Sequence, residues 1–282
     1  MVSNSQQSLL RWAGSKRRLL PQLSHYWMPH YQRYIEPFVG SGALFFSLNP
    51  TAAVLGDINA DLIDCLKTVR DQPKEVHETA VSIPSNRDSY YQVRAIVPSS
   101  LTDVQRAARF IFLNRFSFNG LYRTNLAGQF NVPYAPTKTG RLPSLESFNH
   151  SAEKLKNAVL TCSDFEFLLS EHARPGDFVY LDPPYAASQR RIFSEYDKNT
   201  FTLSDLDRLA SSLSRLDKLK AHWVLSYAYC RESLEAFDRW PSRKIFIQRN
   251  IAGFSRHRRK AAELIVSNVP EKLQNSAFRD TR

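Results

Sequence analysis

The strongest structural signal in the chain is the run Phe178-Val179-Tyr180-Leu181-Asp182-Pro183-Pro184-Tyr185. Four apolar or aromatic residues follow the turn-forming Pro175-Gly176-Asp177, and they predict a short buried strand that is central in a sheet. The two prolines end that strand, because neither can donate to the ladder and Pro183 restricts Asp182 to extended backbone. We therefore expect a carboxylate and the Tyr185 ring at a stiff corner beyond the carboxyl end of the strand, where open α/β sheets bind ligands. The alternative is an ordinary strand-to-loop turn, since Asp-Pro is common in turns.

Length and composition are typical of a globular protein. The 282 residues can bury the core of one domain, or of one domain with an insertion. No apolar run approaches the roughly 20 residues of a membrane span, and the polar segment 1–8 lacks the apolar core of a signal peptide. We expect a cytoplasmic protein without a membrane partner. Cys65, Cys162 and Cys230 lie far apart without metal-ligand spacing, so we expect buried free thiols.

The formal net charge of +11 predicts a polyanionic partner, most often nucleic acid. No acidic residue precedes Glu36, and residues 256–260 read Arg-His-Arg-Arg-Lys. The segments 186–200 and 251–260 are both basic and are expected to be loops, the first of them a mobile lid or a contact to phosphate. The alternative is a protein that is basic without any such partner.

Glycines between a strand and a helix predict a nucleotide-binding turn. The strand signal at 34–38 runs into Val39-Gly40-Ser41-Gly42, and a helix is expected to start at Ala43. Such glycines let an adenosine-bearing ligand approach the backbone, although two glycines alone are a weak signal. The next strand signal, at 52–57, ends at Asp57, where nucleotide-binding folds hold a ribose diol. Lys16, at a predicted helix entrance, either offers a cation to an anionic ligand or is a solvated lysine.

Strand signals return late in the chain, at 158–162, 178–182, 222–227, 244–247 and 263–267. With the two earlier strands they predict a seven-stranded sheet. A parallel crossover needs far fewer residues than the span 63–157, so we expect an inserted helical domain there. The predicted organisation is a discontinuous catalytic domain at 1–62 and 158–270, the insertion at 63–157, and a flexible tail at 271–282.

The Asp-Pro-Pro-Tyr sequence at 182–185 resembles the catalytic motif of amino-methyltransferases that use S-adenosylmethionine. An adenine amino nitrogen is a poor nucleophile because its lone pair is delocalised into the ring. The resemblance implies that the Asp182 carboxylate and the Pro183 carbonyl accept the two N–H bonds of the amine, while Pro184 stiffens the corner and Tyr185 stacks on the base. This is catalysis by positioning and oriented dipoles, and it needs no metal.

Four motifs in order widen the resemblance. Trp-Ala-Gly-x-Lys, Glu-Pro-Phe-x-Gly-x-Gly, Asp-x-Asn-x-Asp-Leu-Ile and Asp-Pro-Pro-Tyr together resemble the Dam-type (D12 class, alpha group) DNA adenine-N6 methyltransferases, from about Leu10 to Asn268. The resemblance implies an α/β, Rossmann-like methyltransferase fold with a mostly parallel sheet and a helical DNA-recognition insertion. The resemblance also implies S-adenosylmethionine as the cofactor. The residues that it implies for the cofactor site are Trp12, Lys16, Phe38, Gly40, Gly42, Asp57, Asp164 and Asp182.

The insertion carries aromatic residues interleaved with arginines and amides between residues 114 and 134. This pattern suits stacking on bases and reading of base edges. The alternative is a hairpin that packs its rings into a core, as we expect of Phe116 and Phe130. The stretch is similar to the recognition hairpin of the family, which implies a DNA-contacting set of Arg11, Phe118, Asn119, Leu121, Arg123, Asn125 and Pro133.

The resulting hypothesis is an enzyme that methylates the 6-amino group of adenine in double-stranded DNA and acts as a monomer. The target base must be flipped out of the stack, with Phe118 as a wedge into the gap. The run Phe118-Asn119-Gly120-Leu121-Tyr122-Arg123 resembles that of relatives that methylate GATC. Two alternatives remain open: methylation of another amino group, such as cytosine N4, an RNA adenine or a protein amide, or a DNA-binding module without catalysis. Restriction-modification is one biological setting that fits.

Overall fold

The structure is a computed structural model that describes residues 8–125, 127–135, 140–186, 201–248 and 260–269. The two predicted basic loops, apart from Ala186 and Lys260 at their ends, and the predicted tail at 271–282 lie outside these ranges. Within the described ranges, no helix combines the length and the apolarity that a membrane crossing requires.

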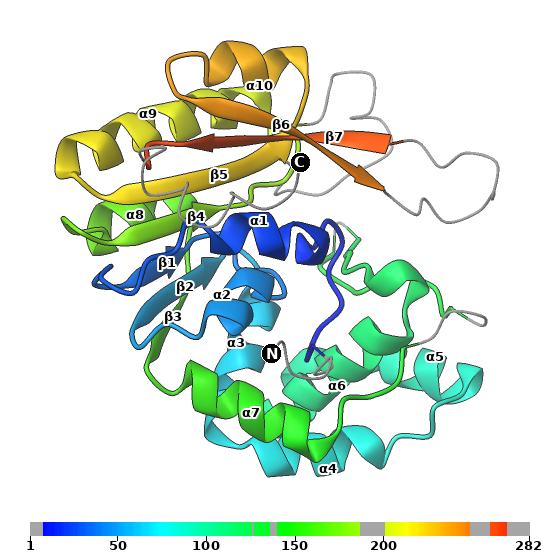
Figure 1. The fold of residues 1–282 in the computed structure, drawn as a ribbon. Coiled ribbons are helices and arrows are strands. Elements are labelled where there is room, and N and C mark those ends of the chain that lie inside the picture. Colours follow the sequence, from blue (N-terminus) through cyan, green and yellow to red (C-terminus); the bar gives the residue numbers. More distant parts are fainter. Residues whose placement is uncertain (1–7, 126, 136–139, 187–200, 249–259, 270–282) are drawn as a thin grey trace.

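Seven strands form one sheet in the order β3-β2-β1-β4-β5-β7-β6 (Figure 1). Strands β3, β2, β1, β4 and β5 run parallel to one another, whereas β7 runs antiparallel to its neighbours β5 and β6. The predicted seven-stranded, mostly parallel sheet is therefore confirmed. Its strands are β1 (Tyr34–Glu36), β2 (Ala53–Asp57), β3 (Ala158–Cys162), β4 (Phe178–Leu181), β5 (His222–Ala228), β6 (Ser242–Gln248) and β7 (Lys260–Ser267).

The central strands are buried on both faces of the sheet. Successive residues of a strand point to opposite sides, so each face has its own core. Tyr34 and Phe178 belong to a core on one face, and Ile35 and Val179 to a core on the other. The first face is covered by η1 (Arg17–Leu19), α1 (Leu20–Ser24), α2 (Ala43–Leu48) and α3 (Ala60–Asp71). The second is covered by α8 (Phe165–His172), α9 (Leu203–Leu219) and the region of α10 (Arg231–Ala236).

The chain between β2 and β3 forms a helical layer beside the sheet (Figure 1). After α3 it consists of α4 (Pro73–Val81), α5 (Arg87–Ala95), η2 (Pro98–Ser100), α6 (Asp103–Phe116), η3 (Phe118–Gly120) and α7 (Leu145–Leu155). A small core around Tyr90 and Phe112 includes Phe116 and Phe130, which confirms the burial expected for these two rings. The segment after α6 turns back on itself, since the Phe118 N–H donates to Pro133 O and the Ala135 N–H to Phe116 O.

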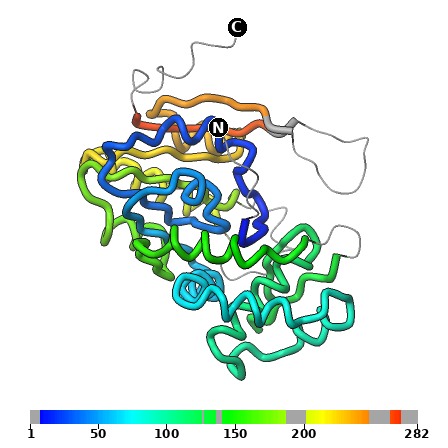
Figure 2. The backbone as a smooth tube through the Cα atoms, turned by 60° about the horizontal axis from the view of Figure 1, so that its bottom comes forward, coloured from blue at the N-terminus to red at the C-terminus, as the bar shows by residue number. Residues whose placement is uncertain are grey.

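An N-terminal segment, residues 8–16, runs from the helical layer to the sheet (Figure 2). The Asn114 side chain of α6 accepts from the Arg11 N–H at 2.8 Å and donates to Arg11 O at 2.6 Å. Arg115 adds a bond from its guanidinium to Ser8 O at 2.6 Å. Asn114 and Arg115 are both buried, so the helical layer holds the N-terminal segment through specific polar contacts.

The expectation that all three cysteines are buried is wrong. Cys65 is buried inside the helical layer, but Cys162 is exposed and Cys230 is half-buried. Cys162 ends β3, which is the edge strand of the sheet. Its exposure follows from that position, because an edge strand has a neighbour on one side only.

Asp217 of α9 joins three parts of the second core. Its carboxylate accepts from the indole N–H of Trp223 at 2.8 Å, from the indole N–H of Trp240 at 2.7 Å, and from the Asn268 amide at 2.8 Å. Trp223 and Trp240 are buried, so neither indole can turn to water if the carboxylate is removed.

We expect Asp217→Ala to lower the free energy of unfolding by about 2–4 kcal/mol, because two buried donors lose their acceptor. Urea denaturation followed by circular dichroism measures the change. Asp217→Asn retains an acceptor oxygen and should lose less. The matched control is Asp207→Ala, an exposed aspartate on the same helix. Equal losses at positions 207 and 217 would contradict the role assigned to the carboxylate.

Candidate functional site

A cavity of about 930 Å³ opens at the carboxyl edge of the sheet. Its walls come from the N-terminal segment, the β1–α2 turn, the end of β2, the start of α8 and the corner after β4. The cavity therefore lies where ligands bind in open α/β sheets. The residues singled out from the sequence that line it are Trp12, Lys16, Phe38, Gly40, Asp57, Asp164, Asp182, Pro183, Pro184 and Tyr185.

The β1–α2 turn needs both of its glycines. Gly40 has φ +46°, and a Cβ there would lie 2.7 Å from Cδ1 of Trp12, so a side chain would collide with the indole. Gly42 has φ +60° and caps α2. Gly42 does not line the cavity but shapes the turn that does. The absence of a side chain at Gly40 therefore lets the Trp12 indole pack directly on this turn at the cavity wall.

Asp57 fixes this turn to the end of β2. Its carboxylate accepts from the Gly40 N–H at 3.1 Å and from the Asn59 N–H at 3.0 Å. Burial raises the pKa of Asp57 above its ordinary value, and the backbone N–H groups act in the opposite direction because they stabilise the charged form. Asp57 thus combines a structural role with a position on the cavity wall.

The corner after β4 holds Asp182 in a polar cluster. Lys16 Nζ lies 2.8 Å from Asp182 Oδ1, and the Ser226 hydroxyl donates to the same oxygen at 3.1 Å. The Ser226 and Tyr180 hydroxyls are themselves 3.0 Å apart. Burial raises the pKa of Asp182 above its ordinary value, and Lys16 works against that rise. The carboxylate is thus fixed in position and held close to a cation.

Tyr185 and Glu263 complete the cluster. The Tyr185 hydroxyl donates to Glu263 Oε1 at 2.7 Å and accepts from Lys16 Nζ at 3.2 Å. Lys16 Nζ is also 3.7 Å from Glu263 Oε2. Burial lowers the pKa of Lys16, but the charges of Asp182, Tyr185 and Glu263 outweigh burial and raise it above its usual range. Lys16 is therefore a stable cation between two carboxylates.

Another part of the cavity wall consists of aromatic rings and an arginine. The Phe38 ring lies 5.3 Å from that of Phe165, which in turn lies 6.3 Å from Phe201. Asp164 caps the start of α8 and pairs at 2.6 Å with Arg208 of α9. The Arg208 guanidinium also covers the Phe165 ring at 4.9 Å. This part of the wall offers apolar ring surface next to a fixed carboxylate.

Sequence reasoning missed several residues of this site. Glu263, Ser226 and Arg208 come from β7, β5 and α9, which lie far along the chain from the motifs. One signal was available for Glu263: a carboxylate within the apolar run Ala262-Glu263-Leu264-Ile265 is costly unless it is paired. No comparable pattern marks Ser226 or Arg208.

The residues predicted to contact DNA lie outside the cavity, around the segment that follows α6. Most of them are exposed, and Phe118 at the tip is 46% exposed. The Arg123 guanidinium donates to the Asn131 side chain at 2.8 Å. Asn119 takes the left-handed backbone conformation. The remaining members are Asn125, whose side chain accepts from Ala127 and Gln129 N–H groups, exposed Pro133, and half-buried Arg11 and Leu121.

The same segment reaches the cavity through other side chains. Tyr122, Thr124 and Gly128 line it, and the Tyr122 ring stacks on Trp12 with centroids 6.2 Å apart. The segment therefore lies beside the cavity and contacts the N-terminal segment that carries Lys16.

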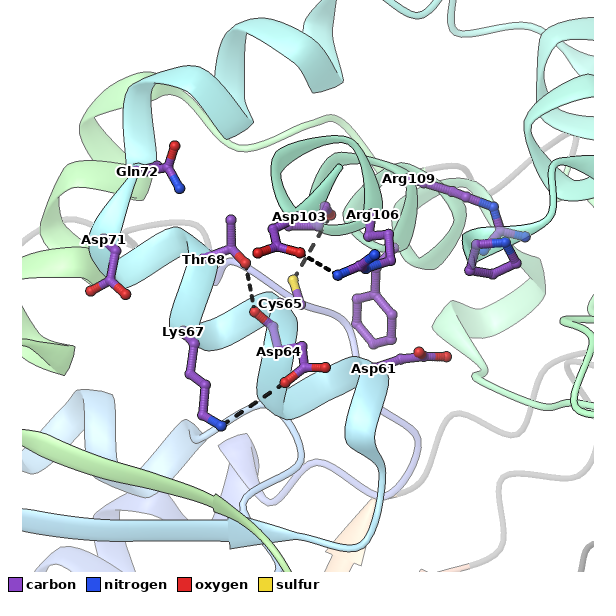
Figure 3. Close-up of a pocket in the computed structure, with 13 residues that line it drawn as sticks. Asp61, Asp64, Cys65, Lys67, Thr68, Asp71, Gln72, Asp103, Arg106 and Arg109 are labelled. Carbon is purple, nitrogen blue, oxygen red and sulfur yellow. Dashed lines mark hydrogen bonds and ion pairs between the residues drawn. The ribbon is translucent and has the colours of Figure 1, made fainter. Parts of the chain in front are cut away.

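A second hollow of about 350 Å³ lies between α3 and α6 (Figure 3). Charged side chains pair with one another there: Lys67 lies 4.0 Å from Asp64, and Arg106 pairs with Asp103. Asp61 lines both hollows. These pairs join neighbouring turns of single helices. The other charged residues around this hollow also have partners in the fold: Asp71 pairs with Arg70, Asp61 accepts from the Tyr122 hydroxyl, and Arg109 donates to Val93 O and Arg94 O.

Comparisons with known proteins agree with the geometry. The sequence model of the family described as D12 class N6 adenine-specific DNA methyltransferase matches residues 12–265. That range includes every part of the chain that lines the larger cavity. It also includes the segment after α6.

Individual relatives are similar over most of their length. The chain is 34% identical over 267 residues to the type II methyltransferase M1.LlaDCHI of Lactococcus lactis subsp. cremoris, covering 92% of this chain and 94% of that protein. It is 32% identical over 269 residues to the DNA adenine methylase of Escherichia coli K12, covering 94% and 96%. It is 35% identical over 243 residues to the type II methyltransferase M.MjaIII of Methanocaldococcus jannaschii, covering 78% and 83%.

We expect Lys16→Met to raise the pKa of Asp182 further, because the ammonium opposes the effect of burial on that carboxyl. Carbon-13 NMR of the Asp182 carboxyl during a pH titration measures this change as a midpoint that moves to higher pH. Lys16→Arg keeps the cation and should stay near the original midpoint. Arg18→Met replaces an exposed cation nearby and is the matched control. A midpoint that moves to lower pH, or that moves equally in the Arg18 variant, would show that Lys16 does not set this pKa.

Proposed function

The chain belongs to the D12 class of N6 adenine-specific DNA methyltransferases, and from that premise we propose that it methylates adenine within the duplex sequence GATC. It is an enzyme that acts on DNA, and its methyl donor is S-adenosylmethionine. When bound, this donor supplies an electrophilic methyl group on a sulfonium. The residues of the chain must bind the donor, orient the target amine and exclude other acceptors.

The lining of the 930 Å³ cavity fits S-adenosylmethionine. Asp57 offers a carboxylate to a ribose diol, and the Phe38 wall suits an adenine ring next to Asp164. Gly40 leaves room for the Trp12 indole at the cavity wall. We assign donor binding to the residues named from the sequence: Trp12, Lys16, Phe38, Gly40, Gly42, Asp57, Asp164 and Asp182. Gly42 contributes through the shape of the turn.

The fixed Asp182 carboxylate is the observation that carries the proposed mechanism. Lys16 and Ser226 both bind its Oδ1, so the carboxylate has a defined orientation at the rigid corner formed by Pro183 and Pro184. The carboxylate and the Pro183 carbonyl accept the two N–H bonds of the target amine, which frees the nitrogen lone pair for the methyl group. Positive charge then develops on that nitrogen, and the nearby carboxylate stabilises it.

Tyr185 supplies the surface on which the target base stacks. Its ring is half-buried beside the cavity and meets the Tyr227 ring edge-to-face at 5.2 Å. An adenine reaches this position only after it leaves the duplex, at a cost of a few kcal/mol. The exposed Phe118 ring, at the tip of the segment after α6, is suited to fill the gap that the base leaves.

GATC is supported by the residues around Phe118. The exposed Arg123 can fork onto the two major-groove acceptors of a guanine, and its bond to Asn131 orients it for this. Leu121 and Pro133 can pack on a thymine methyl group, while Asn119 reaches the neighbourhood of the target. Arg11 lies beside the same segment through its bond to Arg115 O.

We further propose a division of labour along the chain. The parts 1–62 and 158–270 carry the chemistry, and 63–157 carry target recognition, with Asn125 shaping the turn that presents the recognition residues. We assign the enzyme to the cytoplasm, because its substrate is DNA, and we propose that it acts as a monomer. Strand marking and restriction-modification are both compatible with this activity.

Methyl transfer from radiolabelled S-adenosylmethionine should occur on a duplex with GATC and should stop in Asp182→Ala. The variant should still fold and bind the donor, because the carboxylate acts on the target amine. Asp182→Asn keeps one acceptor oxygen and should retain a trace of activity. Three competitors are added in separate reactions: a GATC duplex whose adenines are already methylated, tRNA, and a protein acceptor. Near-normal turnover in Asp182→Ala would rule out the assigned catalytic corner.

Arg123→Ala should weaken binding to a GATC duplex by about 1–3 kcal/mol and relax the preference at one base pair. Methylation rates on duplexes with single base-pair changes measure the effect. Arg87→Ala removes an equally exposed charge from the same insertion and should leave the preference unchanged. A uniform loss across all sequences would make Arg123 a phosphate contact instead. Complete methylation of an unrelated sequence, with GATC untouched, would end the GATC proposal.

A further inference from the structure

Strand β7 carries a carboxylate where its neighbours are apolar. Glu263 is 0% exposed, and Leu264, Ile265 and Val266 after it are buried as well. A charged group in such a place costs several kcal/mol unless it is paired and hydrogen-bonded. The fold must therefore provide partners for this carboxylate, and the identity of those partners indicates its role.

The sheet register brings Glu263 to the catalytic edge. Because β7 runs antiparallel to β5, the start of β7 lies beside the end of β5, and Glu263 pairs with Ala228 (Figure 1). The end of β5 and the end of β4 lie at the same edge, since those strands are parallel. Glu263 thereby reaches Tyr185, which is 78 positions away in sequence.

The two carboxylate oxygens of Glu263 meet two members of the proposed site. Oε1 accepts the Tyr185 hydroxyl at 2.7 Å, and Oε2 lies 3.7 Å from Lys16 Nζ. Lys16 Nζ in turn donates to the Tyr185 hydroxyl at 3.2 Å and lies 5.1 Å from the centre of its ring. The far end of the Tyr185 side chain is therefore held from two directions.

We propose that Glu263 is a positioning residue for methyl transfer: its carboxylate holds the Tyr185 hydroxyl, and so keeps the ring where the flipped adenine stacks. This inference rests on the function proposed above for Asp182 and Tyr185. A tyrosine ring attached to a loop can rotate about two side-chain bonds. The Glu263 contact removes that freedom before the substrate arrives, so less ordering is required when the base enters.

The contact also explains why a tyrosine rather than a phenylalanine suits this position. Stacking requires only the ring, and a phenylalanine ring would stack equally well. The hydroxyl adds a directional bond to a carboxylate that is itself immobile in the sheet. Glu263 takes no proton and touches no reacting atom, so we assign its effect on the rate to its hydrogen bond with Tyr185.

The test uses the full-length enzyme and single-turnover methyl transfer to a GATC duplex. Glu263→Gln keeps the size of the side chain but weakens the bond to Tyr185, and we expect the rate to fall about 10- to 100-fold. The affinity for S-adenosylmethionine should stay within about threefold. Glu235→Gln, the same change at an exposed position on α10, should leave the rate unchanged. An unaltered rate in Glu263→Gln would overturn the proposal.

Tyr185→Phe removes the same hydrogen bond from the other side and protects the test against a folding defect at position 263. We expect a similar fall in rate, and in the Tyr185→Phe background Glu263→Gln should add less than about threefold, because both changes remove one interaction. If the fall in rate of the double variant equalled the product of the falls in the two single variants, the proposal would be overturned, since Glu263 would then act through another contact.

Fluorescence of a duplex with 2-aminopurine at the target adenine gives a readout of the stacking itself. A base stacked on a fixed ring is quenched, so Glu263→Gln and Tyr185→Phe should both give brighter complexes than the unsubstituted enzyme. Equal brightness in all three would overturn the proposal. Asp182→Ala separates the two levels of inference. If it abolishes transfer while Glu263→Gln and Tyr185→Phe are normal, only the role of Glu263 fails, whereas a normal Asp182→Ala removes the proposed site as a whole.

Discussion

Pairing of buried charge at the carboxyl edge of the sheet is the constraint on which the site depends. The Lys16 ammonium lies 2.8 Å from the Asp182 carboxylate and 3.7 Å from that of Glu263. The three side chains come from the N-terminal segment, the β4 corner and β7. The Lys16 and Glu263 side chains are buried, and either of them would be a costly isolated charge without its partners. The contacts to Lys16 therefore fix the relative positions of these three distant parts of the chain. The same arrangement leaves a carboxylate at a rigid corner, as transfer to a weakly nucleophilic amine requires.

Asn114 extends this constraint to the helical layer. Its side chain makes two hydrogen bonds with the backbone of Arg11, and Arg11 is five residues before Lys16 in the chain. The segment that carries the central cation is thus fixed at one end by the helical layer and at the other by the sheet. Tyr122 stacks on Trp12 between these two ends. The surface proposed to read DNA and the cluster proposed to act on the base share one short piece of backbone.

The sequence predicted those parts of the fold that depend on local patterns. The strand before Asp182 ends at Leu181 because two prolines follow, and the turn at Gly40 requires a positive φ. The role of Glu263 could not be predicted in this way, because it depends on the register of β7 against β5 and on a contact to Tyr185, which is 78 positions away in the sequence. The exposure of Cys162 was missed for a similar reason, since the order of strands decides which one forms the edge. Local chemistry sets the elements, whereas contacts between distant segments set the partners of each polar group.

The N-terminal segment has a consequence for how such enzymes can diversify. A recognition insertion that occupied an independent module could be exchanged between relatives as a cassette, with the catalytic part left intact. Here the insertion and residues 8–16 are complementary surfaces, since Asn114 and Arg115 fit the backbone of Arg11 and Ser8. An insertion taken from a relative would lose these bonds, and the N-terminal segment that carries Lys16 would no longer be held by the helical layer. If residues 63–157 carry target recognition, as proposed, specificity and chemistry are inherited together, and a change of target sequence is more accessible through substitutions within the insertion than through recombination at its borders.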